Sequence, residues 1–408
     1  MKNILIAIRS IFKKGRHNVM KIVSLGIGLA VGLVLIAKVY FEQSYDDFYP
    51  DRDRVYQVWA KYQQNGGELK DYPQTSGGIA PTMQQQIPEI ETVTRYTSFG
   101  DWTFTMTDTK MKYSGRCIIA DSCFFDILPR PMLIGNAKEV LSTPMYVLVS
   151  SRIAKNIGGD VIGKNFTVDS SPGRTMTIGG VFEEVPENSH SRYDVIVSMA
   201  SAGRFMWEGS PTNMLGNDRY ISYVKLHKGV NPLALEEQVH TFVNSYFPPE
   251  EQQKTGFNIG FSFHELDGLH KELPQVKRMT WILSLLAFAL IFTAVMNYIL
   301  IVISSIVNRS KEVAVHKCYG ASENNIHGMM FGEALVHIVL SLILALLLIL
   351  AFRGTVEELL ATSLDSLLLS NGSLVLLGIC ILVFFVSGFM PGSLYARIPV
   401  ASAFRNYR

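Results

Sequence analysis

Charge and cysteine are both scarce in this sequence. Of its 408 residues only 18% are charged, and the formal net charge of +2 is too small to indicate nucleic-acid binding. Four cysteines are present, of which Cys117 and Cys123 fall in the long polar stretch of the chain. A disulfide between them is permitted, but we expect two cysteines in a large domain to be free and buried.

Apolar residues are abundant and unevenly spread. They make up 48% of the chain, whose mean hydropathy of +0.20 is too high for an ordinary soluble protein of this size. Four runs are each long enough to cross about 30 Å of hydrocarbon at about 1.5 Å per residue. We predict transmembrane helices at residues 19–41, 279–307, 331–352 and 372–395. Residues 42–278 have ordinary polar composition and are predicted to form a soluble domain.

The lysines and arginines beside the spans predict the orientation. They gather in residues 1–18, 308–330 and 396–408, which we therefore place in the cytoplasm. Residues 353–371 hold one arginine against three acidic residues and suit the opposite side, together with residues 42–278. Apolar and basic positions at helical spacing in residues 1–18 predict an amphipathic helix on the inner leaflet, or the first turns of a longer membrane helix.

The predicted soluble domain mixes strand and helix patterns. Runs rich in β-branched and aromatic residues predict strands at residues 54–62, 92–99, 103–108, 145–150, 165–170, 174–185, 194–199 and 219–226. Apolar spacing predicts helices near residues 80–90, 150–158 and 231–247. The expected fold class is an α-helical integral membrane protein with four transmembrane helices and a large α+β domain inserted between the first and second. The flanking spans must bring the two ends of that domain together.

Two short motifs resemble catalytic patterns and fail on context. Residues 158–165, GGDVIGKN, approach a phosphate-binding loop, but Asn165 replaces the Ser or Thr that holds magnesium and a strand pattern follows. We interpret them as a turn before a strand. HELDGLH begins like a zinc-protease helix, yet His270 comes six residues after His264 and would point elsewhere. We expect both histidines at the surface, and find no reason to class the chain as an enzyme.

Three polar residues fall within the predicted spans. Lys38 is near the outer end of its span, where it can extend to the interface. Asn297 is expected to form a hydrogen bond across helices, with a subunit interface as the alternative. Glu333 is near the cytoplasmic end of its span, where an interfacial carboxylate is tolerated.

A compact charged segment, RSKEVAVHKCYGAS at residues 309–322, separates the second and third predicted spans. Its pattern predicts a helix of about three turns. One side of that helix would carry Glu312, Val315, His316 and Tyr319. Gly320 suits the end of this helix, and Ser322 suits the start of the next. The segment is either a lever beneath the membrane helices or a solvated connector, and spacing alone favours the connector.

The surrounding sequence resembles a known family. Residues 296–336, MNYILIVISSIVNRSKEVAVHKCYGASENNIHGMMFGEALV, are similar to the signature around the second and third spans of FtsX-like and MacB-like ABC transporter permeases. The matching positions are Lys311, Glu312, Val313, Lys317, Gly320, Ala321 and Ser322. Ala314 and His316 depart from the usual Gly and Arg, and a histidine is not a permanent charge. Residues 120–168 and 177–199 resemble the family's periplasmic core domain, and residues 387–405 resemble its ending.

This resemblance implies a non-catalytic permease subunit in the cell inner membrane, with residues 42–278 in the periplasm. It implies no cofactor of its own, because ATP and magnesium bind to a separate ABC ATPase. That ATPase is expected to dock on residues 308–330. The expected coupling residues are Lys311, Glu312, Val313, His316, Lys317, Tyr319, Gly320, Ala321 and Ser322. ATP-driven motion would then export or release a peptide, lipoprotein, lipid or drug in the periplasm by mechanotransmission.

Other partners and functions follow from the same resemblance. The sequence has a single four-span unit where many relatives have two, so we expect a second permease copy or a homologue in the complex, surrounded by membrane lipids. The resemblance leaves open a periplasmic adaptor and an outer-membrane channel. The alternative function is that of an FtsX-like signalling protein or divisome regulator that controls periplasmic cell-wall hydrolases. A secondary transporter is disfavoured, because paired broken helices are missing from the pattern.

Overall fold

The computed structural model describes residues 18–169, 171–304 and 323–368 and the single residues 315, 319, 375, 378, 379 and 382. It divides into two compact units, Met1–Ser44 with Leu273–Arg408, and Tyr45–Glu272. We call the first the helical unit and the second the sheet unit. The predicted amphipathic helix lies outside the described residues apart from Asn18, as do residues 396–408.

The helical unit contains long apolar helices. Its described elements are α2 (Asn18–Gln43), α11 (Pro274–Ser304), α13 (Glu323–Ala351), α14 (Arg353–Leu360) and α15 (Leu364–Leu368). Within the described residues, three helices are long and apolar enough to cross a membrane: Asn18–Gln43, Pro274–Ile301 and Phe331–Ala351. They correspond to the first three predicted spans. The fourth predicted span, residues 372–395, lies outside the described residues except for four single positions.

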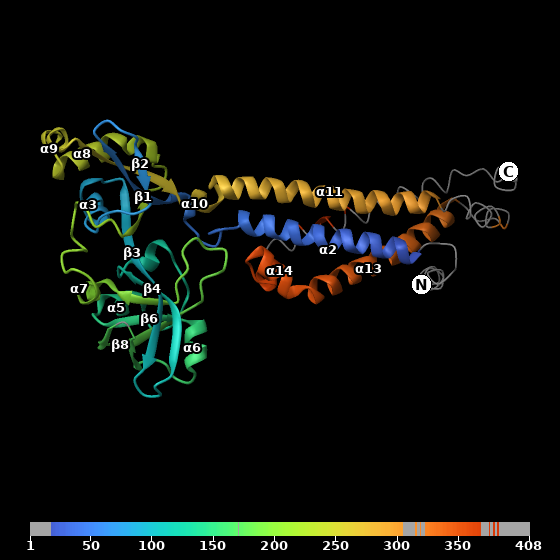
Figure 1. The fold of residues 1–408 in the computed structure, drawn as a ribbon, viewed down its shortest axis with the longest axis horizontal. Coiled ribbons are helices and arrows are strands. Elements are labelled where there is room, and N and C mark those ends of the chain that lie inside the picture. Colours follow the sequence, from blue (N-terminus) through green and yellow to red (C-terminus); the bar gives the residue numbers. More distant parts are fainter. Residues whose placement is uncertain are drawn as a thin grey trace. The chain divides into compact units, whose positions relative to one another are not determined.

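Helix α2 lies between α11 and α13 and packs against both (Figure 1). Leu25 and Leu29 of α2 share a buried core with Tyr298 of α11 and Ile338 of α13. Helix α13 begins at Glu323, so the segment predicted as a loop up to residue 330 is already helical from that residue.

The sheet unit is α+β. Its strands are β1 (Val55–Gln64), β2 (Lys70–Tyr72), β3 (Ile90–Met106), β4 (Lys112–Ala120), β5 (Met132–Ile134), β6 (Tyr146–Ser150), β7 (Asn165–Val168), β8 (Ser171–Phe182), β9 (Val195–Ser198), β10 (Ile221–Leu226) and β11 (Phe257–Glu265). Its helices are η1 (Arg52–Arg54), α3 (Ile79–Gln86), α4 (Phe124–Ile127), α5 (Ala137–Ser142), α6 (Ser151–Ile157), η2 (Met199–Ser201), α7 (Ala202–Phe205), η3 (Pro232–Leu235), α8 (Glu236–Tyr246), α9 (Pro249–Thr255) and α10 (Gly268–Lys271).

Among the described residues, one sheet connects all eleven strands in the order β11-β1-β10-β3-β4-β9-β6-β8-β5, with β2 paired to β1 and β7 paired to β3 and β8. The pairs β4–β9 and β6–β8 are parallel, and the other described pairs are antiparallel. Strand β3 is 17 residues long and replaces the two separate strands that the sequence predicted. Its register shifts between Ser98 and Gly100, and Gly100 has a φ of 73°, which glycine adopts without strain.

Helices α3 and α8 contribute to one of the hydrophobic cores, where Met83 and Phe242 lie with Val58 of β1 and Val224 of β10. The helices predicted near residues 80–90, 150–158 and 231–247 are present as α3, α6 and η3 with α8. The two ends of the sheet unit meet, as expected. The rings of Tyr45 and His270 stack with centroids 3.4 Å apart, and the Lys271 ammonium lies 2.9 Å from an Asp47 carboxylate oxygen.

Candidate functional site

The predicted coupling segment is described at Val315 and Tyr319 only. The Tyr319 amide donates a hydrogen bond to the Val315 carbonyl at 3.0 Å, which is the spacing of one helical turn. The two side chains are 45% and 88% exposed. The other predicted coupling residues, Lys311, Glu312, Val313, His316, Lys317, Gly320, Ala321 and Ser322, lie outside the described residues.

Asn297 bridges two membrane helices. Its amide Nδ2 on α11 lies 2.6 Å from the Ser24 hydroxyl on α2, which confirms the predicted hydrogen bond across helices. Lys38, expected to extend to the membrane interface, is buried instead. Its ammonium lies 2.6 Å from the Glu42 carboxylate and 2.8 Å from the Thr362 hydroxyl, so the protein itself satisfies the charge.

A polar stripe on α13 was missed by sequence reasoning. Glu333, His337 and Ser341 are four residues apart and therefore share one helix face. All three are buried. The Ser341 hydroxyl lies 3.1 Å from the Ile22 carbonyl of α2, and the His337 ring meets the Tyr298 ring of α11 edge-on. The i, i+4, i+8 spacing was the available signal, and it marks the face that packs inward.

A second polar cluster is buried in the sheet unit. The Asp46 carboxylate lies 2.7 Å from His190 Nδ1 and accepts a hydrogen bond from the Ser189 hydroxyl at 3.0 Å. On the other side of the imidazole, Nε2 lies 2.5 Å from the Tyr223 hydroxyl of β10. Burial raises the pKa of Tyr223 well above its ordinary value, so the hydroxyl stays protonated. The cluster ties the start of the unit to its central sheet.

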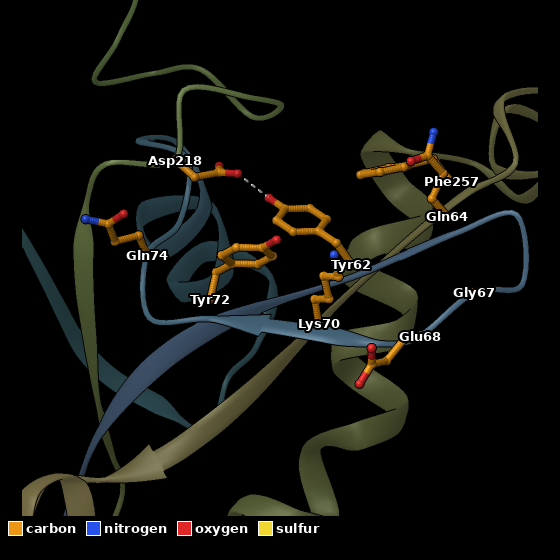
Figure 2. Close-up of a pocket in the computed structure, with 9 residues that line it drawn as sticks. All are labelled: Tyr62, Gln64, Gly67, Glu68, Lys70, Tyr72, Gln74, Asp218 and Phe257. Carbon is orange, nitrogen blue, oxygen red and sulfur yellow. Dashed lines mark hydrogen bonds between the residues drawn. The ribbon is translucent and has the colours of Figure 1, made fainter. Parts of the chain in front are cut away.

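The sheet unit also carries an open pocket of about 680 Å³ beside the β1–β2 hairpin. Its lining residues are Tyr62, Gln64, Gly67, Glu68, Lys70, Tyr72, Gln74, Asp218 and Phe257 (Figure 2). The Tyr62 ring centroid lies 5.7 Å from that of Tyr72 and 5.4 Å from that of Phe257. The three rings therefore form a continuous aromatic surface.

Asp218 fixes the central ring of this pocket. The Tyr62 hydroxyl donates to one Asp218 oxygen at 2.5 Å, and the Ser76 hydroxyl donates to the other at 2.5 Å. Burial raises the pKa of Tyr62, and the bond to Asp218 raises it further, because loss of the proton would place a second negative charge beside the carboxylate. Sequence reasoning did not identify this pocket, since its residues come from three separate stretches of the chain.

The other motifs have structural roles in the described residues. Gly158 ends α6 with a φ of 76° and Asn165 begins β7, which confirms a turn before a strand. His264 lies on β11 and not on a helix, and it stacks on Trp59 with ring centroids 4.2 Å apart. With His270 stacked on Tyr45, both histidines are half-buried and not simply at the surface. Cys117 is free and buried, as expected, and Cys123 is free and half-buried.

Comparisons with known proteins match both units. A family model described as the MacB-like periplasmic core domain matches residues 20–242, and one described as the FtsX-like permease C-terminal matches residues 284–400. No curated protein matches the chain.

Two solved structures are similar to about half of the chain. A domain of a permease protein from Porphyromonas gingivalis is 32% identical and covers 53% of this chain and 91% of that one, with a TM-score of 0.49. The extracellular domain of the noncanonic ABC-type transporter YknZ from Gram-positive bacteria is 10% identical and covers 50% of this chain and 98% of that one, with a TM-score of 0.35.

Proposed function

The chain belongs to the ABC transporter permeases that join a MacB-like periplasmic core domain to an FtsX-like C-terminal region, and from this membership we propose that it couples ATP hydrolysis by a separate cytoplasmic ATPase to work in the periplasm. The observation that carries the proposal is the pair of matches, which together cover most of the three apolar helices and most of the domain between the first two. ATP and magnesium would bind to the ATPase, and this subunit would transmit motion.

In this proposal the chain crosses the inner membrane four times. Residues 308–330 contact the ATPase in the cytoplasm, and residues 42–278 lie in the periplasm. Movement of the helices on ATP binding is transmitted to the sheet unit, which exports or releases a peptide, lipoprotein, lipid or drug. Two permease chains, either identical or homologous, assemble with two ATPase subunits. An adaptor and an outer-membrane channel are optional additions to this assembly.

The decisive experiment is purification of the tagged full-length chain from its native membrane, followed by native mass spectrometry. We expect two permease chains and two ATPase subunits, with ATP hydrolysis retained by the complex. A preparation that contains one permease chain, or that carries no ATPase under mild extraction, would contradict the proposal. Transport assays with candidate substrates would then follow on the intact complex.

A further inference from the structure

We propose that the pocket beside the β1–β2 hairpin binds a glycan chain through the ring surface of Tyr62, Tyr72 and Phe257. The inference concerns the sheet unit alone and does not depend on the proposed ATPase coupling. The volume of the pocket, about 680 Å³, lies in the range of ligand sites in proteins, which is roughly 300–1,000 Å³. The pocket is open to solvent, which suits a segment of a chain better than an enclosed small molecule.

The register of the sheet explains why these side chains meet. Tyr62 pairs with Lys70 across β1 and β2, and Gln64 pairs with Phe257 across β1 and β11. Directly opposite residues in antiparallel strands point to the same face, and so do residues two apart along a strand. The lining side chains of the three strands therefore project from one face of the sheet. A peptide that added a strand would pair with the free edge of β2 or β11, each of which pairs with β1 alone among the described strands, and would not lie on the ring surface.

The floor of the pocket is apolar and held in place. Tyr62 cannot turn without losing its hydrogen bond to Asp218, and its ring supports Tyr72 on one side and Phe257 on the other. A row of rings at an open surface offers flat apolar faces. The C–H faces of pyranose rings are flat and apolar in the same way, so they stack on such a surface while their hydroxyls point to the rim.

The rim supplies both donors and acceptors. In the part of the chain that the structure describes, no hydrogen bond or ion pair engages the side chains of Gln64, Glu68, Lys70, Tyr72 and Gln74. Amides donate and accept, an ammonium donates, and a carboxylate accepts. A charged ligand would bind best to a rim of the opposite charge. A sugar hydroxyl both donates and accepts hydrogen bonds, so it can bond to every kind of group on this rim. The mixed rim therefore favours a polyhydroxyl ligand over a simple ion.

Calorimetry on the full-length chain in lipid nanodiscs tests the proposal. Sugar-headed detergents are avoided because they would compete for the site. The probes are chitotetraose, maltotetraose and a pool of neutral tetrapeptides. We expect saturable binding of at least one oligosaccharide, weakened about tenfold or more by Tyr72→Ala, which removes an exposed ring from the stack. Tyr146→Ala is the matched control, because that tyrosine is similarly exposed, at 39% against 44%, and lies outside the pocket.

Each outcome decides the inference. Oligosaccharide binding that is lost in Tyr72→Ala and in the double variant Gln64→Ala with Gln74→Ala, but kept in Tyr146→Ala, supports a glycan site. Binding that all variants retain places the glycan elsewhere and overturns the proposal. Tetrapeptide binding with the same Tyr72 dependence overturns it in favour of a peptide site, and no heat from either oligosaccharide at millimolar concentration overturns it as well. Unchanged melting temperatures of the variants exclude unfolding as the cause of lost binding.

Discussion

A Cβ placed on Gly28 of α2 would lie only 2.2 Å from the Cβ of Ala294 on α11. Real Cβ atoms do not approach so closely, so the two helices meet at a distance that glycine alone permits. A Cβ placed on Gly32, one turn further along α2, would lie 2.4 Å from Cγ1 of Ile291 on α11. Small residues four apart are a common contact surface of membrane helices, because close backbone approach replaces the missing hydrophobic driving force.

Substitution of Gly28 by leucine should separate α2 from α11. We expect the free energy of unfolding to fall by about 1–3 kcal/mol or more, because the new side chain has no space to occupy. The control is Gly332→Leu on α13, where an added Cβ meets nothing within 4 Å. The measurement is the melting temperature of the purified chain in detergent. Equal melting temperatures for the two variants would show that α2 and α11 do not pack as described.

Replacement of Lys38 alone should lower the stability of the protein more than replacement of both members of its ion pair with Glu42. Lys38→Met leaves the Glu42 carboxylate buried without its cation, which typically costs about 3–5 kcal/mol. The double variant Lys38→Met with Glu42→Leu should recover most of that loss, since no buried charge remains. As a control, Arg353→Met breaks an exposed pair with Glu357 and should change stability far less. A double variant as unstable as Lys38→Met would count against this reasoning.

The buried cluster of the sheet unit should respond to loss of one hydroxyl. Tyr223→Phe removes the partner of His190 Nε2 from a fully buried tyrosine position, and we expect the free energy of unfolding to fall by about 1–3 kcal/mol. Tyr113→Phe is the control, because it removes an exposed hydroxyl. The two variants are compared by thermal unfolding of the full chain, with tryptophan fluorescence as the signal. Indistinguishable transitions would mean that the His190 bond adds nothing to stability.

The sequence of the coupling segment, residues 309–322, leads to a further prediction. If residues 309–322 form a helix against the ATPase, Glu312→Lys should weaken ATPase binding while stability changes by about 0.5 kcal/mol or less. Tyr319→Ala should do the same, since that side chain is 88% exposed.

Gly320→Val should act differently from these two variants, because it distorts the end of the predicted helix. We expect this distortion to cost about 1 kcal/mol or more in the stability of the segment. Binding would then survive while coupled ATP hydrolysis fails. Pull-down of the ATPase and ATP turnover in reconstituted membranes measure both effects. If Glu312→Lys, Tyr319→Ala and Gly320→Val all behave like the parent, the segment is only a connector.

The sequence alone determined the features that depend on composition along the chain. Hydropathy predicted the three described apolar helices, because about 20 apolar residues in a row are needed wherever a helix crosses a bilayer. Runs of β-branched residues predicted strands such as β1, β6 and β10. The segment before and after Arg309 indicated the family, which the two family matches confirm.

The tertiary structure decided what depends on contacts between distant residues. Strand β11 was missed by the sequence analysis, although Phe257, Ile259, Phe261 and Phe263 alternate along it. The pocket was not predictable, because strand register brings Tyr62 and Phe257 together while Asp218 reaches Tyr62 from the segment before β10. In the sequence, Gly28 is one of several glycines in an apolar run, and nothing distinguishes it from the others. Only the packing of α2 on α11 shows that a residue without a side chain is required there.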